Sequence, residues 1–228
     1  MRFDDVALPR QGVTFRADVT LPAGRSVALI GPSGAGKSTA LALIAGFERP
    51  ASGRILLEQH DVAGQAPADR PVTMLFQDNN LFPHLTLMQN AALGLRPTAR
   101  LSAAEQAQVA QSLAAVGLDG LATARPGQLS GGQQSRAALA RALLRARPIL
   151  LLDEPFAALG PAQRLQMFTL VEDIRRAHAM TLVLVTHDPA EAARADMICF
   201  VEGGILYPPR PSGDLLADPP PGLREYLG

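Results

Sequence analysis

The sequence predicts an α/β domain built on a mostly parallel β-sheet, with a helical lobe inserted into the sheet part. Short apolar runs that are typical of strands alternate with helical stretches along the 228 residues. Two of these runs, Ile149–Leu152 and Leu182–Val185, are apolar throughout, which favours parallel strands buried on both faces. Between about residues 83 and 148 the strand pattern disappears, and helical patterns rich in alanine, leucine and glutamine replace it.

The elements follow one another in the order that such a domain requires. The expected strands are Ser26–Ile30, Arg54–Leu57, Val72–Phe76, Ile149–Asp153, Thr181–Thr186 and Met197–Val201. The expected helices are Thr39–Ala45, Leu101–Val116 and Gln134–Arg147. We therefore expect a single domain over residues 1–228, with a sheet core at about 1–82 and 149–207, a helical subdomain at about 83–148 and a proline-rich tail at 208–228.

The composition excludes several classes of function. The chain has 21 basic and 21 acidic residues, so it lacks the basic excess typical of nucleic-acid-binding proteins, and we expect no nucleic-acid partner. Its single cysteine, Cys199, lies in an apolar run and is expected to be a small buried residue in a reducing compartment. No apolar stretch reaches the roughly 18 to 20 residues that span a bilayer, and the first residues lack a signal-peptide core. Any link to a membrane is therefore expected through another protein.

The basic residues are unusual in kind. Only one of the 21, Lys37, is a lysine, and the rest are arginines. Arginine carries a planar fork of donors, whereas lysine carries a compact ammonium on a flexible stem. Position 37 is therefore expected to be a tight site that accepts the lysine ammonium but not the larger guanidinium of arginine.

Lys37 belongs to a glycine-rich motif between a predicted strand and a predicted helix. The motif is G-x-x-x-x-G-K-[ST], and it reads Gly31-Pro32-Ser33-Gly34-Ala35-Gly36-Lys37-Ser38-Thr39. In such a loop the backbone N–H groups cradle phosphate oxygens, and the helix adds the positive end of its dipole. Lys37 can reach the β and γ phosphates, and the Ser38 hydroxyl can ligate Mg²⁺. An ordinary glycine-rich turn is the alternative, but the strand–loop–helix context favours a site for ATP or GTP.

Two acidic residues, Asp153 and Glu154, end the buried strand Ile149–Asp153. A buried pair of carboxylates is costly because each loses its hydration, so a functional reason is expected. Beside a phosphate loop, Asp153 can hold Mg²⁺ through water and Glu154 can act as the general base that polarises the attacking water. The alternative is a pair of acids on a solvated turn.

A second glycine-containing helix start lies at Leu129-Ser130-Gly131-Gly132-Gln133, before the predicted helix Gln134–Arg147. A simple helix N-cap would explain it, and as local chemistry it is also an anion site. In the order phosphate loop, LSGGQ and ILLLDEP, the sequence resembles the ABC transporter ATPase family from about residue 13 to residue 206. The resemblance implies the phosphate-loop fold of that family, with a small antiparallel β part near the N-terminus. It also implies a homodimer that holds two ATP molecules head to tail, so that Ser130, Gly131, Gly132 and Gln133 bind the ATP of the partner subunit.

Two further segments match the family. Met74–Asp78 matches the glutamine loop, which implies that Gln77 contacts Mg²⁺ or the attacking water. Leu184–Asp188 matches the switch-histidine segment, which implies that His187 contacts the γ-phosphate. The other histidines, His60, His84 and His178, match no family motif and are given no role.

The segment after the glutamine loop indicates the partners. In the family this segment docks onto integral-membrane permease subunits, and here Leu81 and Phe82 are the candidate apolar anchors. Packing within the helical subdomain is the alternative for both residues. Docking implies a peripheral protein at the cytoplasmic face of the inner membrane.

Within the family, the stretch Met74–Leu95, read MLFQDNNLFPHLTLMQNAALGL, is very similar to the glutamine-loop region of the ATPase subunits of bacterial thiamine importers. The chain is also short, without the C-terminal β domain of many sugar, polyamine and metal importers. The resemblance implies uptake of thiamine or its phosphates, with a periplasmic thiamine-binding protein as an indirect partner. An ATPase subunit does not contact the solute, so another small solute remains an alternative.

The sequence departs from the family pattern in three places. Where the family has an aromatic residue that stacks on adenine, the chain has none, which leaves Arg10 or Phe15 to contact the base. After ILLLDEP the usual SALD is replaced, and Gly160 stands where an aspartate links the two ATP sites. Finally, the arginine often found two residues past LSGGQ is absent, although Arg136 follows.

Two other functions within the wider family are alternatives. An ATP-switched regulatory subunit under a membrane protein that moves no solute would show the same motifs. A soluble ATPase of DNA repair would need a long coiled coil between the phosphate loop and LSGGQ, and one of translation usually carries two cassettes. The sequence contains neither feature.

Overall fold

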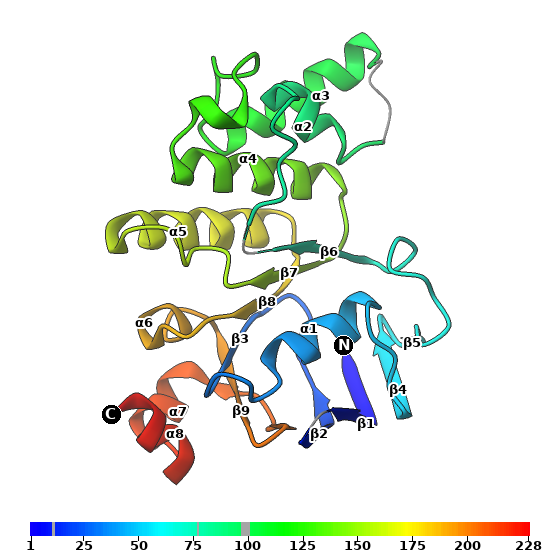
Figure 1. The fold of residues 1–228 in the computed structure, drawn as a ribbon, viewed down its shortest axis with the longest axis vertical. Coiled ribbons are helices and arrows are strands. Elements are labelled where there is room, and N and C mark those ends of the chain that lie inside the picture. The colour runs from blue at the N-terminus through cyan, green and yellow to red at the C-terminus, as the bar shows by residue number, and fades with distance from the viewer. Residues whose placement is uncertain (11, 77, 97–100) are drawn as a thin grey trace. The chain divides into compact units, whose positions relative to one another are not determined.

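The computed structural model describes residues 1–228 apart from 11, 77 and 97–100. It divides into two compact units, and Figure 1 labels the elements of both. Unit 1 comprises Met1–Val72, Pro148–Asp153 and Arg175–Gly228 and contains most of the β-structure. Unit 2 comprises Thr73–Arg147 and Glu154–Ile174 and is mainly helical.

The strands of unit 1 form one sheet. They are β1 (Arg2–Arg10), β2 (Val13–Thr20), β3 (Ser26–Ile30), β4 (Ser52–Leu57), β5 (His60–Asp61), β7 (Ile149–Asp153), β8 (Thr181–Val185), β9 (Met197–Glu202), β10 (Ile205–Leu206) and β11 (Arg210–Pro211). The order across the sheet is β5-β4-β1-β2-β10-β9-β3-β8-β7, and β11 pairs with β9. The neighbours β9, β3, β8 and β7 are parallel, whereas β2, β1, β4 and β5 are antiparallel. This confirms the predicted mostly parallel core with a small antiparallel part near the N-terminus.

The helices are α1 (Lys37–Ala45), α2 (Leu87–Ala92), α3 (Ala103–Ala115), α4 (Gly131–Leu144), α5 (Pro161–Ala177), α6 (Pro189–Ala192), α7 (Ser212–Ala217) and α8 (Pro221–Leu227). A short 3₁₀ turn lies at Pro126–Gln128. The remaining strand, β6 (Val72–Leu75), begins with Val72 of unit 1 and continues with residues of unit 2. None of the helices in the described part of the chain is long and apolar enough to cross a membrane.

The parallel strands are buried because helices cover them. All residues of β3 and β8 are buried, as their continuous apolar sequences predict. Alternate residues of β3, Ala28 and Ile30, pack in a cluster with Ile198 and Phe200 of β9 and with residues of α6, α7 and α8. Cys199 is buried in β9, and burial raises the pKa of its thiol, so this cysteine packs as a small apolar residue, as expected.

The segment from residue 208 is more ordered than the proline-rich tail that the sequence predicts. It forms β11, α7 and α8. Pro221 begins α8, where its missing N–H costs nothing because the first N–H groups of a helix have no partner inside the helix. Leu215 and Leu223 then enter the core over β3 and β9, and this burial holds both short helices in place.

The helices of unit 2 begin at well-defined caps. Helices α2, α3 and α4 pack pairwise against one another. Thr86, Ser102 and Ser130 each cap one of them in a reciprocal capping box with the residue three positions later. The helix predicted at Gln134–Arg147 therefore begins earlier, at Gly131, because the Ser130 cap compensates for two glycines in the first turn.

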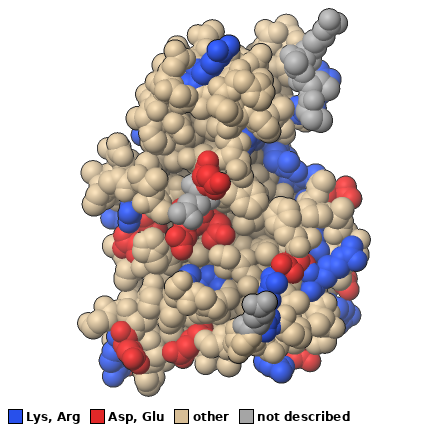
Figure 2. All heavy atoms as spheres, viewed as in Figure 1, with Lys and Arg blue, Asp and Glu red and all other residues tan. Residues whose placement is uncertain are grey.

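On the face in Figure 2, basic and acidic side chains are interspersed on a largely uncharged surface.

Candidate functional site

Three neighbouring strands of unit 1 end at the same edge of the sheet. Strands β3, β8 and β7 are parallel, and Leu29 pairs with Val185, which pairs in turn with Asp153. The chain continues from β3 into the phosphate loop and from β8 into the segment with His187. The predicted loop, Asp153 and His187 are therefore carried by adjacent strand ends, where ligands of open α/β sheets bind.

The loop between β3 and α1 needs glycine at two positions. Gly31 has φ 149°, and a Cβ there would lie 2.0 Å from the backbone oxygen of Val201. Gly36 has φ 110°, and a Cβ there would lie 2.8 Å from Cδ2 of Phe15. Both positions combine a left-handed conformation with a close neighbour, so a side chain would displace the loop.

The start of α1 carries Lys37, the only lysine of the chain. Gly36 precedes the helix and has no side chain to cap it. Lys37 is buried, with 8% of its surface exposed, and its Nζ donates to the backbone oxygens of Gly31 and Pro32 at 2.7 and 2.9 Å. The ammonium thus lies inside the curve of its own loop, which agrees with the expectation of a tight position for the only lysine.

Ser38 and Asp153, predicted to serve one metal ion, lie together. The Ser38 Oγ donates to Oδ1 of Asp153 at 3.3 Å, which joins the first turn of α1 to the end of β7. A hydroxyl and a carboxylate are hard oxygen ligands of the kind that Mg²⁺ prefers. The described residues contain no group of three or more His, Cys, Asp or Glu side chains that would hold a metal ion by themselves.

Glu154 follows Asp153 directly and has an unusual backbone. Its φ is 46°, in the left-handed region that residues other than glycine seldom adopt. Such conformations cost about 1–3 kcal/mol and are concentrated at functional sites. Glu154 belongs to unit 2, and its side chain is partly buried.

The segment that carries His187 is fixed by several hydrogen bonds. The Thr186 N–H donates to the oxygen of Leu29 at 3.3 Å, and the buried Thr186 hydroxyl donates to Oε2 of Glu191 at 2.5 Å. The Asp188 N–H donates to the Thr186 hydroxyl at 3.0 Å. His187 itself is exposed, and its carbonyl accepts a bond from the Tyr226 hydroxyl at 3.1 Å. Sequence reasoning missed Tyr226, which no motif identifies.

In unit 2, the LSGGQ segment forms the start of α4. Ser130 caps the helix by accepting from the Gln133 N–H at 3.3 Å, and Gln133 Oε1 accepts from the Ser130 N–H at 2.9 Å. Ser130 and Gly131 are both exposed, so the first turn of this helix is open to solvent in the single chain. Gln77, the remaining predicted site residue, lies outside the described residues.

A cavity of about 740 Å³ in unit 1 adjoins the phosphate loop. Its lining residues are Pro9, Arg10, Val13, Phe15, Gly34, Ala35, Gly36, Thr39 and Gly204. Both candidates for a base contact line it, but they differ in exposure. Phe15 is 1% exposed and lies edge-on against Phe3, whereas the Arg10 side chain is 40% exposed and forms an ion pair with Glu48 at 2.6 Å. The cavity is large enough for a nucleoside, and Arg10 is the more accessible side chain.

Comparison with known proteins identifies close relatives. A family model described as ABC transporter matches residues 15–157. The chain is 57% identical over 226 residues to the thiamine import ATP-binding protein ThiQ of Cereibacter sphaeroides, and the match covers 98% of each chain. It is 50% identical over 229 residues to the protein of the same name from a Ruegeria species, covering 100% of this chain and 99% of that one.

Solved structures agree with the sequence relatives. The dimeric structure of a bacterial ABC transporter cassette matches with a TM-score of 0.78 and 27% identity, over 92% of this chain and 98% of that one. A dimeric ATP-binding cassette in a post-hydrolysis state, bound to ADP and Pi, matches with a TM-score of 0.76 and 28% identity over the same shares. With this fold, these motifs and these relatives, the chain belongs to the ABC transporter family as one of its ATP-hydrolysing cassettes.

Proposed function

We propose that this cassette drives the import of thiamine or its phosphates by hydrolysing ATP as a homodimer bound to membrane permease subunits. The observation that carries the proposal is the convergence of the phosphate loop, Lys37, Ser38 and Asp153 at one sheet edge. The solute is inferred from a relative 57% identical over 98% of both chains, which is named as a thiamine import ATP-binding protein.

The phosphate loop binds the triphosphate of ATP. The glycines bring backbone N–H groups close to the phosphate oxygens, and α1 presents the positive end of its dipole to them. In the structure, the Lys37 ammonium donates hydrogen bonds to the backbone oxygens of Gly31 and Pro32. When ATP binds, it exchanges these neutral partners for charged phosphate oxygens. The base lies in the cavity between this loop and the β1–β2 hairpin, where Arg10 supplies a guanidinium plane.

Ser38 and Asp153 hold a magnesium ion, with Gln77 as a further ligand implied by the family resemblance. Their oxygens lie 3.3 Å apart, so only a small adjustment lets both face one ion or its water shell. When bound, Mg²⁺ neutralises charge on the β and γ phosphates. The fold holds the two ligands on regular elements of unit 1, because Ser38 lies on α1 and Asp153 ends β7.

Glu154 acts as the general base, and His187 contacts the γ-phosphate. Glu154 accepts a proton from the attacking water, a role that needs an ionised carboxylate within hydrogen-bond reach of that water. Its left-handed backbone turns the chain sharply immediately after the metal ligand Asp153, so consecutive residues serve different partners. His187 approaches from the end of β8, beside the loop that holds the phosphates.

The homodimer completes each ATP site. Ser130, Gly131, Gly132 and Gln133 form a solvent-accessible helix start with no side chain on its glycines, as a phosphate contact from a second subunit requires. Two solved cassettes with the same fold are described as dimeric, one of them with ADP and Pi bound. A head-to-tail pair places this helix start over the ATP on the phosphate loop of the partner subunit.

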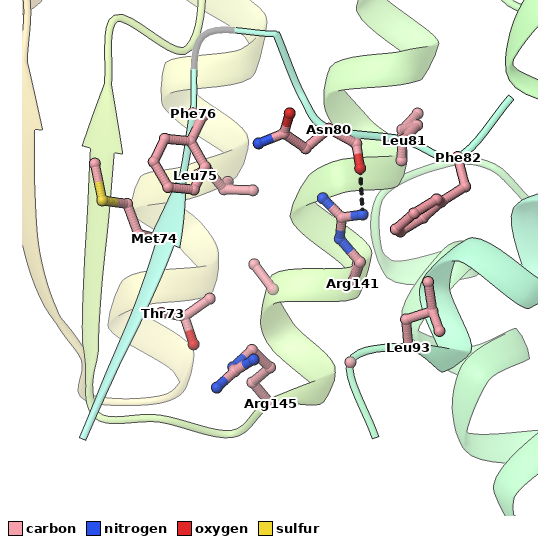
Figure 3. A pocket seen from close by; sticks show the side chains of 12 residues that line it. Thr73, Met74, Leu75, Phe76, Asn80, Leu81, Phe82, Leu93, Arg141 and Arg145 are labelled. Carbon is pink, nitrogen blue, oxygen red and sulfur yellow. Dashed lines mark hydrogen bonds between the residues drawn. The ribbon is translucent and has the colours of Figure 1, made fainter. Parts of the chain in front are cut away.

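The permease docks on unit 2 beside Leu81 and Phe82. A cavity of about 540 Å³ is lined there by residues of β6, of the loop after it and of α4 (Figure 3). Arg141 fixes this loop by donating to the oxygens of Asn79 and Asn80 at 2.8 and 2.7 Å. Asn90 also bonds to both the N–H and the oxygen of Phe82, at 2.8 and 3.1 Å.

These bonds hold Phe82 in an exposed position. Phe82 is 47% exposed although its backbone is fixed, and Leu81 beside it is partly buried. An ordered, exposed aromatic next to a cavity is typical of an interface anchor and favours docking over packing within the subdomain. Docking on a permease places the cassette at the cytoplasmic face of the inner membrane as a peripheral subunit.

The substitution Glu154→Gln tests the proposed chemistry. It keeps the size of the side chain and removes the base, so ATP should still bind while hydrolysis falls at least about 100-fold. Size-exclusion chromatography with ATP and Mg²⁺ should then show a stable dimer. Glu58→Gln is the matched control, because Glu58 is an exposed glutamate that also has a positive φ. A Glu154→Gln variant that hydrolyses ATP at the wild-type rate would contradict the assignment.

A further inference from the structure

We propose that Tyr226, on α8, is a positioning residue for ATP hydrolysis, because its hydroxyl fixes the backbone at His187. The inference rests on the proposed function, in which His187 contacts the γ-phosphate. It assigns a role to a part of the chain that none of the sequence motifs reaches.

The contact joins residues that are distant in sequence. The Tyr226 Oη donates to the carbonyl oxygen of His187 at 3.1 Å, across 39 residues. Thr186 and Asp188 are held by bonds to Leu29 and within their own segment, on either side of His187. The Tyr226 bond acts on the carbonyl of His187 itself. The His187 side chain is exposed, so burial does not fix its direction, and the backbone conformation at His187 sets which rotamers its ring can adopt.

Helix α8, which carries this hydroxyl, is fixed by packing against the core. Leu223 is fully buried in the cluster that contains Ala28 and Ile30 of β3 and Ala192 of α6. Tyr226 is partly buried and packs against the same cluster. Strand β3 leads directly into the phosphate loop, and α6 directly follows the His187 segment. The cluster therefore ties α8 to both segments that the proposed reaction uses.

The expected effect is on the rate of hydrolysis rather than on ATP binding. Removing the hydroxyl frees the His187 backbone but leaves the phosphate loop unchanged, so KM for ATP should stay within about twofold. The bond is exposed to water, and the net value of such bonds is small, so kcat should fall by about two- to fivefold.

The substitution Tyr226→Phe isolates the hydroxyl because the ring still packs on the cluster. The matched control is Tyr207→Phe, since the chain has only two tyrosines. Tyr207 stacks on Phe200 with ring centroids 6.1 Å apart and takes no part in the bond to the His187 carbonyl. Two readouts are needed: the ATPase kinetics of the assembled transporter, and the imidazole NMR signals of the four histidines in the purified chain.

Tyr226→Phe should lower kcat and shift or broaden the His187 signal, and Tyr207→Phe should do neither. The double variant His187→Ala with Tyr226→Phe should be no slower than His187→Ala alone, because the hydroxyl acts through His187. A further loss in the double variant would overturn the inference, as would a change in melting temperature without a change in the His187 signal.

The controls separate this inference from the proposed function. If His187→Ala abolishes hydrolysis while Tyr226→Phe behaves as wild type in both readouts, the inference is wrong and the role of His187 stands. If His187→Ala hydrolyses ATP normally, the role of His187 in the proposed function is wrong, and the positioning role of Tyr226 is wrong with it.

Discussion

Replacing the only lysine with arginine should abolish most ATP binding, although both side chains are cationic. In the structure the Lys37 Nζ lies 2.7 and 2.9 Å from two carbonyl oxygens of its own loop, and 8% of the residue is exposed. A guanidinium is larger and planar, so it cannot occupy this space without moving the loop. Gly31 and Gly36 leave the loop little room to move, because each already lies against a neighbour.

The magnitude follows from two costs. Overpacking a tight site costs about 1–3 kcal/mol, and a lost hydrogen bond to a charged group costs about 1.5–3 kcal/mol. Together these costs are about 2.5–6 kcal/mol, so at about 1.4 kcal/mol per tenfold change the affinity for ATP should fall about 60- to 20,000-fold in Lys37→Arg. Lys37→Met adds no bulk, so it should lose only the hydrogen bond to a charged group. It should therefore bind ATP more tightly than Lys37→Arg.

Isothermal titration calorimetry with ATP in the presence of EDTA measures this loss without metal binding or hydrolysis. The control is Arg16→Lys, because Arg16 is exposed on β2, and it should bind ATP as the wild type does. Circular dichroism should show that all variants are folded. A Kd for Lys37→Arg within threefold of the wild-type value would refute the argument that the shape of the site selects lysine.

Three further predictions concern stability and cooperativity. Arg70 is fully buried and bonds to the oxygens of two residues in the last turn of α1, while its Nε and Nη2 have no partner among the described residues. In urea unfolding, Arg70→Ala should therefore cost about 2–5 kcal/mol, because it leaves a cavity and removes the donor to two carbonyl oxygens, and Arg70→Met clearly less, because its side chain fills most of the space; equal losses would contradict this reasoning. Hydrogen bonds from Arg54 and Arg2 hold the pKa of Asp4 below its usual value, so the stability that Asp4 contributes is present above the unfolded pKa and lost as pH falls through the folded one. The difference in melting temperature between wild type and Asp4→Asn should shrink from pH 7 to pH 3, and a constant difference would count against it. Gly160 has no positive φ, and a Cβ added there would meet no described atom within 4 Å, so Gly160→Asp should fit and raise the Hill coefficient of ATP hydrolysis. Strong cooperativity in the wild type that the substitution leaves unchanged would show that other residues couple the two sites.

The parallel core could be predicted from the sequence because its signals are local. Strands β3 and β7 match the predicted bounds residue for residue, since their continuous apolar runs end sharply at the glycine motif and at two carboxylates. The antiparallel part was expected only through the family resemblance, because β1 mixes charged and apolar residues and contains Pro9. The hairpin of β1 and β2 is local, but the pairing of β1 with β4, which joins Arg2 to Leu56, is a long-range contact that no short window of sequence contains.

The parts that the sequence did not predict depend on tertiary packing. Helix α8 is too short to be stable alone, and its proline-rich surroundings are typical of a loop. It forms because Leu223 is buried over β3 and β9, an environment that sequence reasoning cannot see. The bond from Tyr226 to His187 is missed for the same reason. By contrast, Ser38 and Asp153 could be paired in advance, because each lies in a motif that follows a parallel strand, and the structure brings them to 3.3 Å.

Uptake of thiamine by whole cells tests the central claim most directly. A strain that lacks this gene and has no second thiamine importer is complemented with wild type, Lys37→Ala or Glu154→Gln, and initial uptake of labelled thiamine is measured at low external concentration. Uptake should be lost in the deletion strain, return with the wild type and not return with either variant, although both variants are expressed. Normal uptake in the deletion strain, or full rescue by Lys37→Ala, would contradict it.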